Sequence, residues 1–213
     1  PMLRRFLHEG ARTPFKIAIP PSSAAHVTAA ADRSDSHEVY EIRIQDSHPF
    51  NSTAYNKVVR QRPRQIRYFL DAGCSVLYAD IDTVWVENPL REISRAGNFE
   101  MYVTDDARKA KGLMSDNLCS CFLYMHPTSK VKAVMRRWES MLEGKLQRNQ
   151  IKFNEAFHDI RKCFPDFAVA LPQTKFPPGC HNASHPTVLH ANWLSGEQNK
   201  MTFLKKHGVW SLN

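Results

Sequence analysis

Two aspartates that follow a short apolar run are the best candidates in this chain for binding a metal ion. The run Cys74–Ala79 comes after Gly73 and is short and apolar, which predicts a buried strand. Asp80 and Asp82 follow it, and side chains two positions apart on a strand point the same way. We therefore expect both carboxylates to project from the carboxyl end of the strand, where open α/β sheets bind ligands, and Ile81 to turn back into the core.

Paired carboxylates supply the hard oxygen ligands that Mg²⁺ and Mn²⁺ prefer, and such an ion can neutralise the charge of a bound diphosphate. The Asp-x-Asp pattern has low specificity by itself, because a solvated strand end or a helix cap can contain the same residues. The rest of the chain has to decide between these interpretations.

A second group of candidate ligands lies near the C-terminus. His190 ends a short apolar segment, and a histidine there can add a nitrogen ligand to two carboxylates. Gly196 lets the backbone approach a phosphate closely, and Lys200, at the start of a predicted helix, can pair with a phosphate as a point charge. Alone, His190 is typical of an ordinary core or surface histidine. Together with the aspartate pair it becomes a candidate metal ligand, because both groups fall at strand ends of one sheet.

Helices and strands alternate along the chain. Apolar periodicity predicts helices over residues 54–72 with a break at Pro63, from Thr128 or Ser129 to about Leu142, around 153–160, and over 201–207. Strands are predicted at 39–44, 74–79, 101–103, 119–125, 167–171 and 187–190, and Asn88-Pro89 is predicted to form a turn. This alternation predicts an α/β fold with a mainly parallel sheet.

The composition is typical of a globular protein, and its basic residues indicate for the most part a solvated basic surface. The 213 residues suffice for one α/β domain with a core, and no apolar run approaches the ~18 residues of a membrane span. The net charge of +8 favours nucleic acid, an anionic membrane, a sulfated sugar or a nucleotide diphosphate as partner. Basic residues are scattered without a nucleic-acid motif, and the five cysteines contain no Cys-x-x-Cys pair, so a structural zinc site is not indicated.

From about residue 50 to residue 213, an ordered set of short motifs resembles a known family, the nucleotide-diphospho-sugar transferases of glycosyltransferase family 77. The motifs are Leu70 with Gly73, Asp80-Ile81-Asp82-Thr83-Val84-Trp85, Asn88-Pro89, Phe122-Leu123-Tyr124, His126-Pro127, Trp138, Gln150-Ile151-Lys152-Phe153-Asn154, Leu171, Lys175-Phe176-Pro177, His190-Ala191-Asn192, Gly196, Lys200 and Gly208-Val209-Trp210. Their order and spacing are more specific than any one motif.

The resemblance implies a GT-A fold, a Rossmann-like nucleotide-sugar domain with a mainly parallel mixed sheet flanked by helices. We expect residues 1–213 to form a single glycosyltransferase domain that lacks an upstream segment, with an irregular N-terminal region over 1–37. The family moves a sugar, a hexose or a pentose, from a nucleotide-diphosphate donor, commonly UDP-linked, with Mn²⁺ or Mg²⁺ and with retention of configuration. The implied acceptor is a hydroxyl of a glycan or glycoprotein, and nucleic acid is not an expected partner. The implied location is the Golgi lumen, in a type II membrane protein whose anchor is not present in this chain.

The resemblance also implies roles for individual residues. Asp80 and Asp82 would bind the metal, Asp80 would also contact the nucleotide ribose, and His190 would complete the metal site. Gly196 and Lys200 would hold the diphosphate. Lys200 has a catalytic role in this scheme, because it stabilises the charge that grows on the departing diphosphate.

Gln150 is the second catalytic candidate, since the family places this residue beside the reacting sugar carbon. The alternative is that Gln150 only caps the following helix. On position alone, Asp105 or Asp106, and Arg62 or Arg64, would contact the donor sugar or phosphates.

Three positions differ from the family pattern. Asn149 stands where an Asp is usual, and Cys119 and Cys121 stand where an Asn and a Gly are common beside the donor sugar. Two alternatives to a transferase therefore stay open. One is a catalytically silent family member. The other is a basic module for glycan or nucleic acid, in which His190 and the segment Cys180-His181 with His185 form a metal-stabilised loop.

Overall fold

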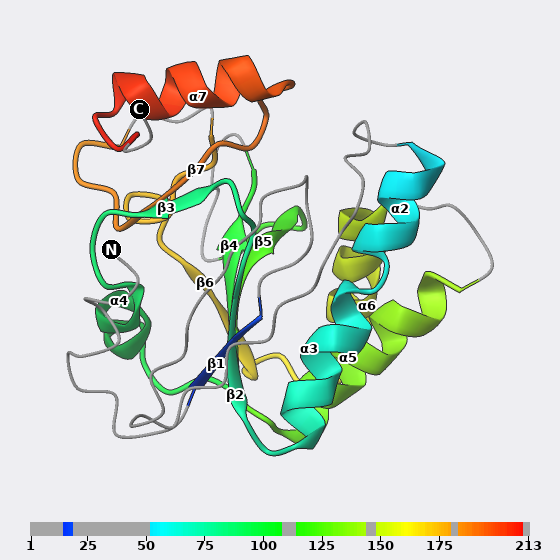
Figure 1. Cartoon of the computed structure of the whole chain (residues 1–213). Helices are drawn as coiled ribbons and strands as arrows, with labels where there is room; N and C mark the ends of the chain where they lie inside the picture. The colour runs from blue at the N-terminus through cyan, green and yellow to red at the C-terminus, as the bar shows by residue number, and fades with distance from the viewer. Residues whose placement is uncertain (1–14, 19–51, 108–113, 144–147, 180–182, 211–213) are drawn as a thin grey trace, which may run out of the picture.

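A mixed sheet lies between two layers in the computed structural model, which describes residues 15–18, 52–107, 114–143, 148–179 and 183–210 (Figure 1). The sheet has the order β1-β2-β5-β4-β6, with strands β1 (Phe15–Ala18), β2 (Ser75–Ala79), β4 (Met101–Asp105), β5 (Leu118–Met125) and β6 (Ala168–Leu171). β1 is parallel to β2 and β6 to β4, whereas β5 runs antiparallel to both β2 and β4. All strands but β5 therefore share one direction. The predicted α/β class with a mixed sheet flanked by helices is confirmed.

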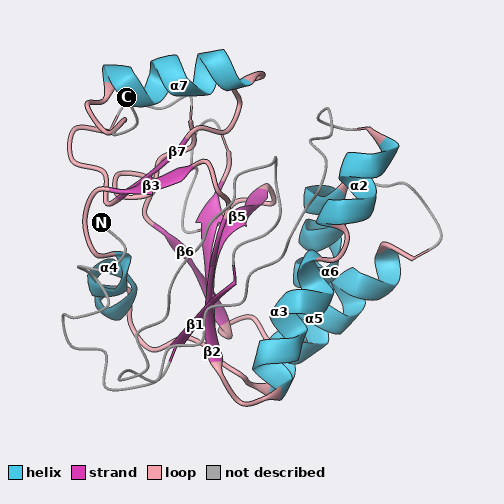
Figure 2. Cartoon of the chain, viewed as in Figure 1, coloured by secondary structure: helices cyan, strands magenta, loops and turns pink. Residues whose placement is uncertain are grey.

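Helices cover one face of this sheet (Figure 2). They are α3 (Arg62–Asp71), α5 (Ser129–Met141) and α6 (Asn149–Cys163), and α2 (Thr53–Val59) precedes them. The predicted break at Pro63 is confirmed, because this proline is the second residue of α3, where its missing N–H costs no intrahelical hydrogen bond. After α3 the N–H of Gly73, at φ 82°, donates to the carbonyl of Leu70.

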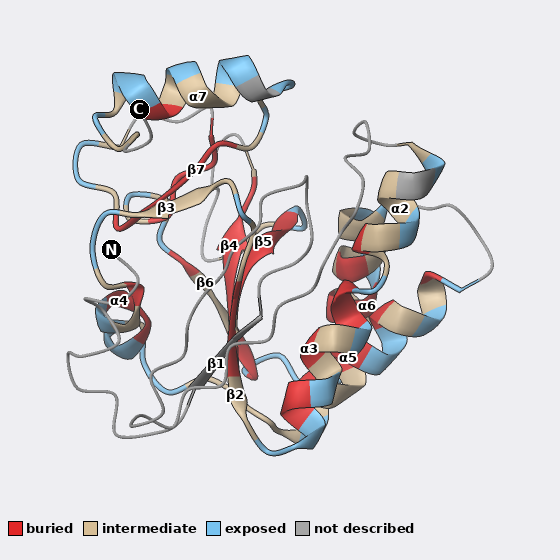
Figure 3. Ribbon diagram, in the orientation of Figure 1, coloured by how far each residue is buried: buried red, intermediate tan, exposed pale blue. Residues whose placement is uncertain are grey.

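Large apolar side chains hold this layer to the sheet. Trp138, Phe153 and Phe157 are fully buried, and Figure 3 shows buried residues on the inward sides of the helices and along the strands. The apolar stripe predicted for the helix after Thr128 is therefore core, and the Thr128 side chain accepts the N–H of Val131 as its cap.

The opposite face of the sheet carries α4 (Pro89–Arg95) and a two-stranded antiparallel ribbon of β3 (Thr83–Trp85) and β7 (Val188–His190). Helix α7 (Glu197–Lys206) follows β7 in the sequence and lies on the outer side of this ribbon (Figure 1). A second core of Leu77, Ile93, Phe122, Phe176 and Val188 fills this side. The ribbon matters for function, because it joins the segment after β2 to the C-terminal part of the chain.

Three local predictions are wrong. Ile81 is 44% exposed rather than buried, because the chain turns after β2, with the N–H of Thr83 donating to the carbonyl of Asp80. Asn88 and Pro89 do not form an isolated turn but begin α4, where the Asn88 side chain accepts the N–H of Leu90. Residues 15–18 form edge strand β1 inside the region 1–37 that the sequence predicts to be irregular.

The remaining residues of 1–37 and the predicted strand 39–44 lie outside the described residues. That residues 1–213 form a single domain stays a prediction. Across the described ranges, no helix has both the length and the apolar character needed to cross a bilayer.

Candidate active site

The carboxylate of Asp82 is the centre of the candidate site. Its Oδ1 lies 3.2 Å from Nε2 of His190, and its Oδ2 lies 2.5 Å from Nζ of Lys200. The β3–β7 ribbon creates these contacts, because it pairs Thr83 with His190, and the N–H of Ala191 donates to the carbonyl of Asp82. Residues more than 100 positions apart in sequence are thus held together by backbone pairing.

Asp80 faces the same site from the other side of the turn. Its Oδ1 accepts a hydrogen bond from the Tyr78 hydroxyl at 2.7 Å and pairs with Nη2 of Arg62 at 3.0 Å. Three possible ligand atoms lie within 4.8 Å of one another, one from each of Asp80, Asp82 and His190. Two carboxylates and an imidazole at this spacing fit a divalent ion such as Mn²⁺ or Mg²⁺.

Neighbouring charges and hydrogen bonds keep the Asp82 carboxylate ionised. Burial raises the pKa of the Asp82 carboxyl, but the hydrogen bonds and charges of His190 and Lys200 outweigh burial and hold this pKa well below its ordinary value. Asp82 is therefore ionised at neutral pH. Lys200 is its counter-ion in this arrangement, so a metal ion bound to Asp82 would compete with Lys200 for this carboxylate.

Arg62 is the arginine that reaches the site. It is 8% exposed, donates from Nη1 to the carbonyl and hydroxyl of Ser120 at 3.2 and 3.0 Å, and stacks over the ring of Tyr78 at 5.0 Å. Arg64 is exposed on α3 and is not brought to the site. The sequence does hold the signal that separates them, because Arg62 falls one turn before Ile66, on the buried face of α3.

Asp106 links Gln150 to the C-terminal segment. Its Oδ1 accepts hydrogen bonds from Nδ2 of Asn192 at 2.7 Å and Nε1 of Trp193 at 2.8 Å, and its Oδ2 accepts one from Nε2 of Gln150 at 3.0 Å. Gln150 does not cap its own helix, since the N-cap of α6 is Arg148. The structural alternative for Gln150 is therefore not a cap but a contact with buried Asp106.

Sequence reasoning missed Trp193. It has a left-handed backbone at φ 62°, a conformation that a non-glycine residue rarely adopts, and the residue is 46% exposed. Its hydrogen bond to Asp106 offsets part of that strain. The only hint in the sequence is its place directly after His190-Ala191-Asn192.

Asp105 has a different role from Asp106. Its carboxylate accepts the N–H of Ala107 at 2.8 Å, and the N–H and hydroxyl of Ser115 at 2.8 and 2.6 Å. These bonds join the two ends of the segment between β4 and β5. Asp105 thus stabilises that connection, and Asp106 is the member of the pair that faces Gln150.

Gly196 precedes α7 at φ 83°, which only glycine adopts readily, and no other atom would lie within 4 Å of a Cβ built there. Lys200 lies one helical turn later, and its side chain reaches Asp82. The open backbone at Gly196 and the cation at Lys200 fit the predicted diphosphate site at the start of this helix.

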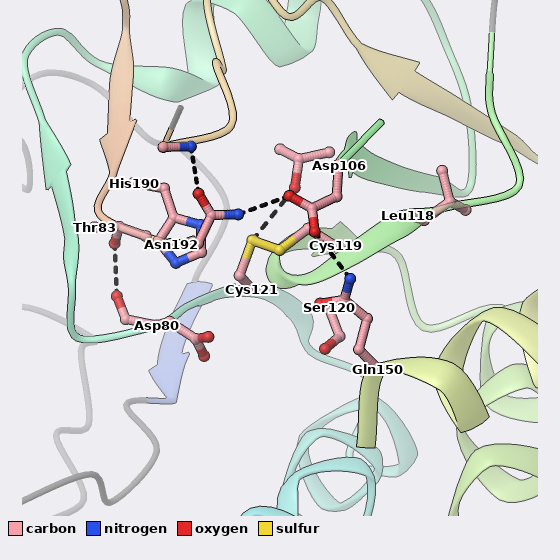
Figure 4. The surroundings of a disulfide bond; sticks show 12 residues. Asp80, Thr83, Asp106, Leu118, Cys119, Ser120, Cys121, Gln150, His190 and Asn192 are labelled. Atoms are coloured by element: carbon pink, nitrogen blue, oxygen red, sulfur yellow. Dashed lines mark hydrogen bonds between the residues drawn. A yellow bond between two sulfur atoms is a disulfide. The ribbon is translucent and has the colours of Figure 1, made fainter. Parts of the chain in front are cut away.

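A disulfide between Cys119 and Cys121 lies beside these groups (Figure 4). Both cysteines are 4% exposed, and with His190, Asp106 and Asn192 they line a cavity of about 20 Å³. The sequence analysis did not predict this bridge, because a Cys-x-Cys pair on a strand carries no established pairing signal.

A comparison with known protein families shows to which family this chain belongs. The sequence model described as nucleotide-diphospho-sugar transferase matches residues 26–204. The chain belongs to the nucleotide-diphospho-sugar transferase family. The matched range of this family contains every residue of the candidate site, and the predicted resemblance is confirmed.

Relatives within the family include plant enzymes from Arabidopsis thaliana. UDP-D-xylose:L-fucose alpha-1,3-D-xylosyltransferase is 23% identical over 198 residues, which cover 77% of this chain and 52% of that protein. UDP-D-xylose:L-fucose alpha-1,3-D-xylosyltransferase MGP4 is 24% identical over 194 residues, which cover 78% of this chain and 53% of that protein. The chain spans about half the length of the curated relatives it matches. No solved structure matches it significantly.

Proposed function

We propose that this chain is a metal-dependent glycosyltransferase domain that moves a sugar from a UDP-linked donor to a hydroxyl of a glycan or glycoprotein, with retention of configuration and a GT-A fold. The observation that carries the proposal is the cluster of Asp80, Asp82 and His190 with Lys200 on Asp82. Family membership makes a nucleotide-sugar donor the natural ligand for this cluster.

The names of the relatives point to the donor class. Those plant proteins are described as transferring D-xylose from UDP-D-xylose to L-fucose. We infer a UDP-pentose, with UDP-xylose as the first donor to try, and a sugar hydroxyl as acceptor.

Asp80, Asp82 and His190 would hold Mn²⁺ or Mg²⁺, and the bound ion would supply Lewis-acid stabilisation of the diphosphate. Lys200 would exchange its contact with Asp82 for one with the diphosphate, and its charge would then stabilise the leaving group as the sugar departs. Arg62 keeps Asp80 oriented through the 3.0 Å ion pair. These roles require no separate pair of acid and base carboxylates.

Gln150 and Asp106 would position the donor sugar. The amide nitrogen of Gln150 donates to Asp106, which leaves the amide oxygen as the end that can face the reacting sugar carbon. A carbonyl oxygen there would stabilise positive charge that develops on that carbon.

We also propose a secretory location, in the Golgi lumen. The Cys119–Cys121 disulfide supports an oxidising compartment.

Sugar transfer from UDP-xylose to free fucose and to fucosylated glycans, with and without Mn²⁺, tests the proposal. We expect transfer or donor hydrolysis that requires the ion and is lost in Asp82→Asn but kept in Asp166→Asn, which removes an exposed carboxylate away from the cluster. UDP binding without turnover on any UDP-sugar would instead support a catalytically silent member. Polyanion binding that weakens steeply with salt and ignores Asp82 would support the basic module.

A further inference from the structure

The Cys119–Cys121 pair lies in a bulge of β5. Thr104 of β4 pairs with Cys119, but the preceding Val103 pairs with Leu123, so residues 120–122 of β5 have no partner in β4. The two cysteines flank Ser120 with their Cα atoms 5.2 Å apart. Side chains at alternate positions of a strand share a face. Both sulfur atoms are therefore directed to the same side.

His190 completes a second cluster on that side. One ligand atom each from Cys119, Cys121 and His190 lie within 4.8 Å of one another, and all three residues are buried. Two sulfurs and an imidazole form a ligand set for zinc and other soft or borderline ions, unlike the two carboxylates on the other side of His190.

The surroundings leave room for an ion. The cavity beside the disulfide has a volume of about 20 Å³, enough for one water-sized body, and Thr83 and Asn192 are among the residues that line it. Three protein ligands would leave the fourth tetrahedral position of a zinc ion for a water molecule. Figure 4 shows Asp106, Asn192 and His190 around the disulfide.

We propose that reduction of the Cys119–Cys121 disulfide creates a binding site for a zinc ion, formed by the two thiolates and His190. A dithiol reductant transfers two electrons to the disulfide, which breaks the S–S bond and yields two thiols, while the reductant becomes a cyclic disulfide. On metal binding each thiol gives its proton to solvent, and His190 binds as a neutral imidazole. In the oxidised protein the sulfurs are bonded to each other, and the site does not exist.

This site shares His190 with the carboxylate cluster. Nε2 of His190 lies 3.2 Å from Asp82, and a neutral imidazole has one lone pair for a metal ion. Zinc at the thiolates would therefore withdraw the nitrogen ligand from Asp80 and Asp82. The inhibition of sugar transfer that this implies rests on the proposed function, whereas zinc binding does not.

Cobalt(II) titration tests the site, because thiolate ligation gives Co²⁺ an intense charge-transfer absorption in the near ultraviolet. The protein carries Cys74→Ser, Cys163→Ser and Cys180→Ser, so that the pair is its only source of thiols. We expect the absorption to appear in the dithiol-reduced, desalted protein, to be absent from the oxidised protein, and to vanish when Zn²⁺ displaces Co²⁺.

Two variants separate this site from the carboxylate cluster. Asp82→Asn should keep the cobalt absorption of the reduced protein, even though it removes Mn²⁺ binding. His190→Ala should weaken Co²⁺ binding by at least about ten- to a hundredfold, the loss that removal of an outer-shell partner of a metal ligand already causes. The oxidised and reduced forms can be compared without any change at Cys119 or Cys121, so the test does not depend on a variant that fails to fold. Absence of the absorption in the reduced protein, or its persistence in Cys121→Ser, would overturn the proposal. Failure to bind UDP or Mn²⁺ would leave it standing.

Discussion

Nζ of Lys200 lies 2.5 Å from Oδ2 of Asp82, so the cation proposed for the diphosphate and the carboxylate proposed for the metal are direct partners. This pairing couples the two halves of the site. If Asp82 holds a metal ion as proposed, Lys200 would lose this partner and its ammonium would be free to contact the diphosphate. The ion pair would then favour joint binding of metal and donor over binding of either alone.

Lys200→Ala should raise the affinity for Mn²⁺ in the absence of UDP by a few-fold, because the competing cation is removed. The same variant should lower turnover by about 100-fold or more, since one charge contact to the leaving group is lost. Electron paramagnetic resonance of free Mn²⁺ and steady-state transfer measure the two effects. Lys205→Ala, an exposed lysine of the same helix, is the matched control. Weaker Mn²⁺ binding in Lys200→Ala would show that Lys200 does not compete for Asp82.

Arg62→Ala should destabilise the fold by about 3 kcal/mol, because it leaves Asp80 without its cation and removes a largely buried side chain. Arg64→Ala, on the exposed face of the same helix, should change stability by less than about 0.5 kcal/mol. Urea denaturation of both variants gives the comparison. Equal effects of the two substitutions would show that the ion pair between Arg62 and Asp80 does not stabilise the fold.

Asp82 should make the folded state sensitive to acid. Its pKa is held below the ordinary carboxyl value in the folded protein, so its ionised form stabilises the fold above the unfolded pKa of about 3.9. That contribution is lost as the pH falls from this value towards the folded pKa.

Urea titrations at pH 5 and pH 3 measure how much unfolding free energy the protein loses between these two pH values. This loss should be about 1 kcal/mol smaller in Asp82→Asn than in the wild type. Asp166→Asn supplies the comparison for removal of an exposed carboxylate. The same pH dependence in Asp82→Asn and the wild type would mean that His190 and Lys200 do not perturb Asp82.

Gln150→Ala should lower turnover by roughly one to two orders of magnitude while UDP affinity changes little, the size expected for one electrostatic contact with the reacting sugar. Steady-state transfer beside UDP titration on the same variant measures both, and Gln198→Ala, an exposed glutamine of α7, is the control. Unchanged turnover, or an equal loss of UDP binding and turnover, would limit Gln150 to its structural contact with Asp106.

Local patterns were sufficient to predict most of the helices and strands. An apolar run before Asp80 predicts β2, and the stripe ending near Leu142 predicts α5; both elements exist. The prediction that Asp82 and His190 lie together at strand ends of one sheet is right about their proximity and wrong about the sheet, because His190 ends β7 of the separate β3–β7 ribbon. The route differs, because the two residues meet through the β3–β7 ribbon, and pairing between segments 108 positions apart has no local signature.

The details of the site depend on tertiary contacts that periodicity cannot show. Helical periodicity separates Arg62 from Arg64, because only Arg62 shares a face with Ile66, but it does not show that Arg62 pairs with Asp80. Asp105 and Asp106 are adjacent in sequence, yet one binds its own loop and the other binds Gln150. The left-handed backbone of Trp193 is likewise fixed by its surroundings, here by the bond to Asp106.

Calorimetric titration of UDP, with and without Mn²⁺, into the wild type and Asp82→Asn tests whether Asp82 belongs to a metal site that binds the nucleotide. The account predicts saturable one-to-one binding to the wild type that strengthens at least tenfold when Mn²⁺ is present, as expected for neutralising a diphosphate in a protein site. It predicts that this gain disappears in Asp82→Asn. UDP binding that is indifferent to Mn²⁺, or a gain from Mn²⁺ that survives in a correctly folded Asp82→Asn, would contradict the assignment of this cluster as the metal site.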